Sequence, residues 1–104
     1  IVGVSYKPDI DDVRESPALD IMQLLNDKGA DVSWYDPEVD SLTGLDFAVK
    51  TEKWSVSELS CYDIVIIVTP HSVVDHEVIL DADTLIVDTR NALGAIKRAD
   101  VFSL

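Results

Sequence analysis

The chain has 104 residues, of which 47% are hydrophobic and 27% charged, a composition typical of one globular domain and unlike that of a disordered segment. The formal net charge of −12 argues against nucleic acid and anionic membranes as partners, because both bind basic surfaces. No apolar run approaches the roughly 20 residues that span a bilayer. Cys61 is the only cysteine, so no internal disulfide can form and a reducing, cytoplasmic location is expected.

The first element expected is a buried parallel strand over Ile1–Ser5, a short apolar run that contains β-branched residues. The chain enters this strand without a start methionine or the basic flank of a signal peptide, and we therefore expect it to be a fragment of a longer enzyme. A polar loop follows over residues 6–15. Ser16 as N-cap and Pro17 at the first helical position then predict a helix that ends at Lys28-Gly29.

The middle of the chain is predicted to hold shorter elements. A strand is expected over Asp31–Asp36, which Pro37 ends. Residues 38–53 read as a loop with a short element around 47–50. Ser55 or Ser57 would cap a short helix that reaches Leu59.

The last third alternates strands and a helix. The clearest buried strand is Asp63–Thr69; a helix is predicted over Ser72–Leu80, a strand over Thr84–Asp88 and a last strand over Val101–Leu104. Strands that alternate with helices imply βαβ crossovers and a sheet with helices on its faces. The predicted fold is α/β: one three-layer Rossmann-like domain over residues 1–104, with a mainly parallel sheet.

Two of the eight cations fall where an open α/β sheet binds ligands, outside the carboxyl ends of its strands. Lys7 follows the first strand, and Arg90 follows the Thr84–Asp88 strand. In so acidic a chain, a lysine and an arginine at this edge are what phosphate recognition requires. The alternative is that both merely neutralise nearby acids, namely Asp9, Asp11, Asp12 or Asp88. Spacing alone leaves both interpretations open.

Arg14 stands directly before a helix N-terminus, where the helix dipole favours negative charge instead. This mismatch indicates an anionic partner outside the domain, although a surface ion pair with Glu15 or Asp12 would also account for it. The acidic loop of Asp9, Asp11 and Asp12 could hold Mg²⁺, but a solvated loop is the favoured interpretation.

The remaining candidates for chemistry have ordinary explanations. His71 is interpreted as a loop histidine beside Ser72, the expected N-cap, and His76 as a structural residue of that helix. Cys61 has no neighbouring cation that would activate it, and is expected to be partly buried and inert. No G-x-G-x-x-G, phosphate-binding Walker loop, paired metal ligands or Ser-His-Asp set can be assembled, so we expect no catalytic residue and no metal site in this chain.

The run from Gly3 to Ala18, GVSYKPDIDDVRESPA, resembles the opening of the C-terminal, UDP-binding domain of the UDP-glucose/GDP-mannose dehydrogenase family. Further matches follow in order at Gly29-Ala30, Tyr35-Asp36-Pro37, Ala82-Asp83 and Val87–Asn91. The resemblance implies an NAD-dependent oxidoreductase that acts on a CH-OH group and converts a UDP-sugar to a UDP-uronic acid, as in polysaccharide biosynthesis. The family's catalytic cysteine and NAD-binding domain belong to parts of its chain that this sequence lacks, so the isolated domain should be inactive.

Residue by residue, Tyr6 and Lys7 match the family's aromatic-lysine pair that contacts the nucleotide sugar, and Arg90 matches its substrate-binding arginine. Arg14 matches an arginine that reaches toward NAD across the cleft, commonly across a subunit boundary. The implied partners are therefore a UDP-sugar, the rest of the same polypeptide and further subunits of a homo-oligomer, with NAD bound mainly by the missing domain. The dipeptide Arg90-Asn91 is more similar to the UDP-N-acetylhexosamine branch than to the UDP-glucose branch.

Two other function classes fit a small parallel α/β domain. A receiver-type signalling module would use Asp36 as phosphoacceptor and Thr69 as switch, but it requires a lysine where this chain has Arg90. A bare interaction domain would bind no small ligand at all.

Overall fold

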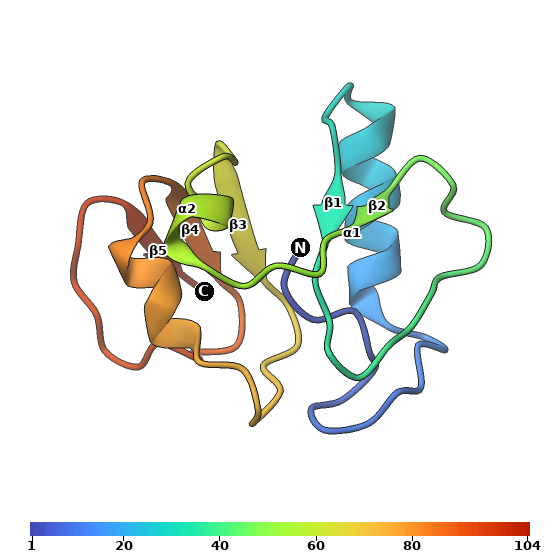
Figure 1. Cartoon of the computed structure of the whole chain (residues 1–104), viewed down its shortest axis with the longest axis horizontal. Coiled ribbons are helices and arrows are strands. Elements are labelled where there is room, and N and C mark those ends of the chain that lie inside the picture. Colours follow the sequence, from blue (N-terminus) through green and yellow to red (C-terminus); the bar gives the residue numbers. More distant parts are fainter.

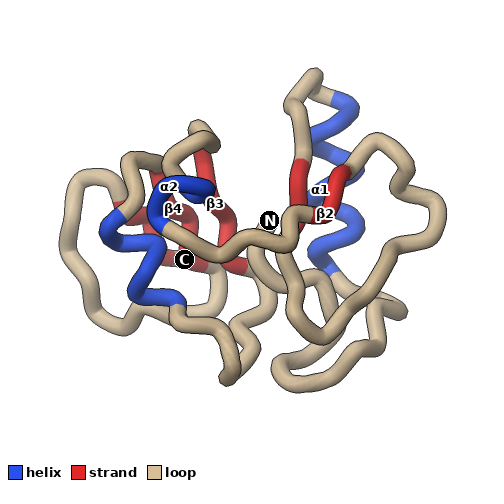
Figure 2. Tube along the Cα trace, viewed as in Figure 1, coloured by secondary structure: helices blue, strands red, loops and turns tan.

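The computed structural model describes all 104 residues and has one parallel sheet at its centre. Strands β1 (Ser33–Trp34) and β2 (Val49–Lys50) pair in parallel, as do β3 (Ile64–Ile67), β4 (Leu85–Asp88) and β5 (Val101–Ser103). Val2 forms parallel bridges to both Tyr35 and Ile67, so the first segment joins the two groups. The order β2, β1, first segment, β3, β4, β5 is that of the doubly wound dinucleotide-binding fold. This confirms the predicted fold class (Figures 1 and 2).

Helix α1 (Pro17–Asp27) covers one face of the sheet and begins and ends as the sequence predicts. The Ser16 hydroxyl accepts a hydrogen bond from the Ala18 N–H, and Pro17 occupies the first turn. Gly29, with φ +90°, takes the left-handed conformation that follows many helix ends. Apolar side chains of α1 and of the sheet form one buried cluster: Val4, Ala18, Met22, Val32, Trp34, Val39 and Val68.

Helix α2 (Val56–Leu59) and the 3₁₀ helix η1 (His76–Asp81) cover the opposite face. They pack over β3 and β4 and complete a second buried cluster: Val2, Leu59, Val65, Ile67, Ile79, Ala82 and Ile86. Ser55 caps α2, because its hydroxyl accepts a hydrogen bond from the Glu58 N–H, in agreement with the first of the two predicted caps. The domain thus has three layers, with the two clusters on either side of one sheet.

The helix predicted over Ser72–Leu80 is wrong at its start, because η1 begins at His76 with Asp75 as its N-cap. Ser72 lies outside this helix, and both its N–H and its hydroxyl donate to the Asp9 carboxylate instead. The observed strands are also shorter than predicted. The first segment forms only the two bridges at Val2, although it lies at the centre of the sheet.

All strands are parallel, and their carboxyl ends meet at one edge of the sheet. Figure 1 shows the loop after the first segment (dark blue) and the loop after β3 (gold) leaving at this lower edge. In proteins with this strand order, ligands commonly bind outside the carboxyl ends of these two strands, where the direction of winding reverses.

Candidate functional site

Lys7 lies just past the first segment, in a loop whose backbone is anchored while its side chain is exposed. The Tyr6 N–H donates to the Asp12 carbonyl over 2.7 Å, and the Ser5 hydroxyl donates to the Lys7 carbonyl over 2.7 Å. The Lys7 ammonium stands 5.6 Å from the centroid of the Tyr6 ring, within the range of a cation–π contact. It forms no salt bridge with a carboxylate.

Arg90 lies two residues past β4, in a turn that a buried carboxylate organises. Asp88 is fully buried and accepts hydrogen bonds from three backbone N–H groups, those of Arg90 (3.2 Å), Ala92 (3.0 Å) and Leu93 (2.9 Å). Its negative charge is therefore satisfied by the backbone. The Arg90 guanidinium is exposed and has no ion-pair partner.

The loops that carry Lys7 and Arg90 leave the same edge of the sheet, with β3 between them. Two strand spacings separate their strands, or roughly 10 Å. The acids near these cations have other partners: Asp9 binds Ser72, Asp12 binds Arg14, and Asp88 binds the backbone. Neither Lys7 nor Arg90 forms an ion pair with any of the acids that the alternative interpretation named, Asp11 included.

Arg14 forms a surface ion pair with Asp12, one of the two acids that the sequence offered as partners. Its guanidinium contacts the Asp12 carboxylate at 2.8 Å while its side chain stays 87% exposed. Hydrogen bonds from the Arg14 side chain and backbone lower the pKa of Asp12 to about 2. The exposed pair can exchange Asp12 for another anion at little cost, because solvent screens an ion pair on the surface.

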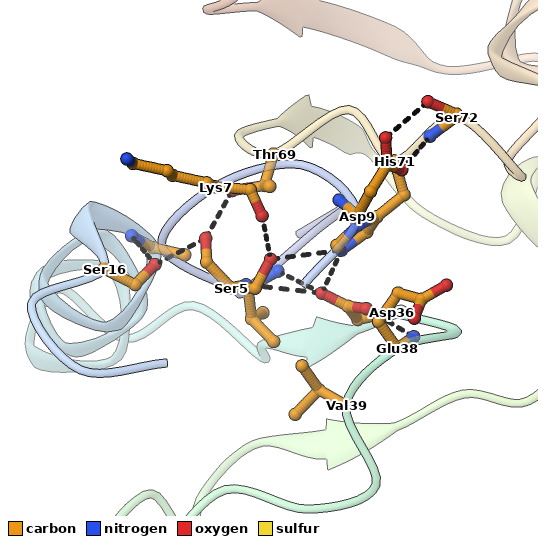
Figure 3. A network of polar contacts seen from close by, with 12 residues as sticks. Ser5, Lys7, Asp9, Ser16, Asp36, Glu38, Val39, Thr69, His71 and Ser72 are labelled. Carbon is orange, nitrogen blue, oxygen red and sulfur yellow. Dashed lines mark hydrogen bonds and ion pairs between the residues drawn. The ribbon is translucent and has the colours of Figure 1, made fainter. Parts of the chain in front are cut away.

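Asp36 is the centre of a buried polar network, shown in Figure 3. Its Oδ2 accepts hydrogen bonds from the Val4 N–H (2.8 Å), the Ser5 N–H (3.3 Å) and His71 Nε2 (2.8 Å), and its Oδ1 accepts one from the Glu38 N–H. The side chain is completely buried. A phosphoacceptor needs an exposed carboxylate, so this environment argues against the receiver-type alternative. Thr69 is no free switch either, because its buried hydroxyl donates to the Ser5 carbonyl.

Ser5, His71 and Asp36 meet in this network, which sequence spacing did not reveal, but they do not form a nucleophilic triad. The Ser5 hydroxyl and the Asp36 carboxylate both contact Nε2 of His71, at 3.2 and 2.8 Å. A triad requires them on opposite ring nitrogens. All three side chains are buried, and the Ser5 hydroxyl donates to a carbonyl. The expectation of no catalytic residue stays a prediction, and this cluster gives no reason to abandon it.

The remaining candidates from the sequence are Cys61, His76 and the acidic loop. Cys61 is exposed instead of partly buried, and its thiol donates to the Ser57 carbonyl one helical turn earlier. His76 is half-buried in η1, where the side chain of Trp54 lies edge-on to its ring. Asp9 and Asp12 of the acidic loop face separate partners, Ser72 and Arg14, so their carboxylates do not converge on one point.

A cavity of about 450 Å³ lies away from this edge. It lies near the amino ends of the strands, beside α1, and its walls include Ile1, Leu25, Tyr62, Ile64 and Ile66. No lysine or arginine lines it, so it lacks the charge that an anionic ligand would require. We therefore place the candidate anion site at the carboxyl edge of the sheet and not in this cavity.

A family model described as the UDP binding domain of the UDP-glucose/GDP-mannose dehydrogenase family matches residues 1–95. The chain belongs to this family. The resemblance seen in the opening run of the sequence is thereby confirmed over most of the chain.

Among curated members of the family, UDP-glucose 6-dehydrogenase of Rickettsia conorii is 30% identical over 82% of this chain and 24% of its own. UDP-N-acetyl-D-mannosamine dehydrogenase of Methanococcus maripaludis is 32% identical over 70% of this chain and 16% of its own. The solved UDP-N-acetyl-mannosamine dehydrogenase of Staphylococcus aureus superimposes with a TM-score of 0.68 and 30% identity, over 98% of this chain and 24% of its own. The chain thus spans about a quarter or less of the length of these relatives.

None of the helices combines the length and the apolar character that a membrane span requires.

Proposed function

We propose that this chain is the nucleotide-sugar-binding domain of a longer NAD-dependent 6-dehydrogenase, in which Tyr6, Lys7 and Arg90 contact a UDP-sugar. The observation that carries the proposal is that Lys7 and Arg90 stand without acidic partners at one edge of a domain of net charge −12. Similarity to UDP-sugar dehydrogenases supports it, because their domain of this type is described as UDP-binding.

Lys7 and Arg90 together suit the two phosphate groups of a UDP-sugar. Lys7 offers a point charge with three donors, and Arg90 a planar fork that can bind two phosphate oxygens at once. Tyr6 is 44% exposed beside Lys7 and adds an aromatic face and a hydroxyl. The sugar is proposed to be of the UDP-N-acetylhexosamine or the UDP-glucose type, since relatives of both types match.

The chain is not built to hold NAD by itself. The only glycine near its first crossover, Gly3, packs against Thr69 within the sheet and forms no phosphate-cradling loop. NAD would supply the hydride acceptor, bound by residues outside this chain. Arg14 is proposed to face that cofactor, and a neighbouring subunit of a cytoplasmic homo-oligomer is one way to bring the two together.

A titration with UDP tests the substrate site. We expect Lys7→Ala and Arg90→Ala each to weaken UDP binding about tenfold or more, because each removes a charge-assisted hydrogen bond to phosphate. NMR chemical-shift titration of the 104-residue chain detects affinities in the millimolar range and measures the loss directly.

Lys28→Ala provides the matched control. It removes the same charge at the far end of α1, by the amino edge of the sheet, and should leave UDP affinity within about twofold of that of the parent chain. Equal affinities for all four proteins would contradict the proposed site.

A further inference from the structure

The position of Lys7 depends on hydrogen bonds that its neighbours make with the buried network. The Lys7 carbonyl accepts from the Ser5 hydroxyl at 2.7 Å, and the Asp9 N–H, two residues on, donates to Nδ1 of His71 at 2.8 Å. These bonds hold the backbone on both sides of an otherwise exposed lysine. Figure 3 shows Lys7 extending away from the network while its backbone stays next to Ser5.

His71 can make its contacts in one protonation state only. Nδ1 accepts from the Asp9 N–H and therefore carries no proton, so the proton of the neutral ring is on Nε2, where it donates to Asp36. Protonation of Nδ1 would replace this acceptor with a second donor that faces the Asp9 N–H. The remaining hydrogen bonds to Asp36 come from the backbone, and they fix the carboxylate that orients the ring.

Asp9 is held on both sides in a conformation that a non-glycine residue seldom adopts. Its φ is +67°, in the left-handed region, which is strained for a residue with a side chain. Its N–H binds His71, and its carboxylate accepts from the N–H and the hydroxyl of Ser72, both at 2.6 Å. The pKa of Asp9 is lowered by these Ser72 hydrogen bonds, consistent with a carboxylate fixed in its charged form. His71 and Ser72, in the loop after β3, thus hold Asp9 of the loop after the first segment at two points.

We infer that His71 is a positioning residue for the nucleotide site: through Nδ1 it fixes the Asp9 backbone, and with it the loop that presents Lys7 to the diphosphate. The inference takes the identity of the ligand from the proposed function. The geometry on which it depends comes from the hydrogen bonds of His71 alone. His71 is buried, so it acts on the site through the loop and without contact with the ligand.

Two substitutions separate the hydrogen bonds of the ring. The side-chain oxygen of Asn stands near the position of Nδ1 and can still accept from Asp9, whereas the amide nitrogen of Gln stands near Nε2 and can still donate to Asp36. His71→Asn loses a buried hydrogen bond to a carboxylate and His71→Gln a part-buried one to a backbone amide, so His71→Asn should be the more destabilised of the two. Only His71→Gln loses the bond to the Lys7 loop.

We expect His71→Gln to weaken UDP binding by about fivefold or more and to speed hydrogen exchange at the Asp9 amide by about tenfold, with His71→Asn close to the parent chain in both. Equal losses in the two folded variants would reduce His71 to a general packing role and overturn the inference. Unchanged affinity and exchange in both would overturn it as well.

A measurement on the parent chain needs neither variant nor ligand. Nitrogen NMR of the His71 ring at neutral pH should show Nε2 protonated and Nδ1 unprotonated; the opposite tautomer, or a doubly protonated ring, would overturn the inference.

Lys7→Ala and Arg90→Ala in the same UDP titration distinguish the two proposals. If both Lys7→Ala and Arg90→Ala bind UDP as the parent does, the proposed function fails, whereas the ring tautomer and Asp9 exchange still decide the role of His71.

Discussion

The backbone of Gly3 passes so close to Thr69 that no side chain fits between them. A Cβ at this position would lie 1.9 Å from the Thr69 carbonyl oxygen and 2.6 Å from its carbon, and the Gly3 φ of +83° disfavours any L side chain. Because the obstacle is backbone at the centre of the sheet, nothing can move aside cheaply. We expect Gly3→Ala to lower the free energy of unfolding by about 3 kcal/mol or more, as measured by urea denaturation.

Gly44→Ala separates the two causes. Gly44 has a similar φ of +79°, but a Cβ there would meet nothing within 4 Å. The substitution should cost only the conformational strain, about 1 kcal/mol. Similar losses at both glycines would show that the close approach to Thr69 contributes nothing.

His76 provides a pH-dependent prediction at the same scale. Burial lowers the pKa of His76 below its ordinary value of 6.5, and its Nε2 is buried without a hydrogen-bond partner. On acidification the unfolded chain therefore takes up this proton before the folded chain does. The contribution of His76 to stability is constant above about pH 6.5 and falls as the pH drops below it, toward the lowered pKa of the folded state.

His76→Gln removes this titration and leaves the other groups in place. We expect the free energy of unfolding of the parent chain to fall more steeply than that of the variant between about pH 7 and pH 5. Urea denaturation at several pH values measures both slopes. Parallel curves would mean that the pKa of His76 is the same in the folded and unfolded chains.

At the scale of elements, those with local signals were predicted well. The Ser16-Pro17 start and the Gly29 end of α1 are determined by residues adjacent in the sequence. Strands β3 and β4 follow from short apolar runs, and the edge position of Lys7 and Arg90 follows from the parallel sheet.

What was missed depends on contacts between distant residues. The link from Asp36 to His71 joins positions 35 apart, and the one from Asp9 to Ser72 joins positions 63 apart. The second of these involves Ser72, the expected N-cap, which lies outside η1. No local pattern identifies such partners. A useful signal was nevertheless present, since His71 follows a buried strand at the same edge as Asp36 and Ser5.

The turn after β4 yields a prediction at this scale. Asn in place of Asp88 would direct an N–H₂ group at one of the three backbone donors that the carboxylate now accepts. At least one buried hydrogen bond would be replaced by a contact between two donors. We expect Asp88→Asn to lower the free energy of unfolding by about 2 kcal/mol, measured by urea denaturation. Asp83→Asn, at an exposed site just before β4, should change it by less than about 0.5 kcal/mol. Equal changes would contradict the role assigned to Asp88.

For the whole molecule, the arrangement of helices around the sheet explains which part of the sheet remains uncovered. Parallel sheets are normally covered on both faces. Here α2 and η1 cover one face of β3 and β4, but α1 covers the other face only beside β1 and the first segment. Ile64 pairs with Leu85, and Phe102 pairs with Val87 on the same face. These strands therefore present an apolar surface, on which Ile64 is 49% exposed, Leu85 44% and Phe102 53%.

This uncovered surface should dominate how the isolated chain behaves toward apolar probes. Adjacent exposed apolar side chains bind such probes better than scattered ones do. We expect a variant with both Leu85→Thr and Phe102→Thr to bind a fluorescent apolar dye at most about half as strongly as the parent chain, since threonine keeps the strand propensity and removes apolar area. Val73→Thr, at an isolated residue that is 70% exposed in the loop after β3, serves as the control and should leave dye fluorescence unchanged. If the control reduces fluorescence as much as the double variant does, the dye does not recognise the uncovered half of the sheet, and the probe-binding surface must be sought elsewhere.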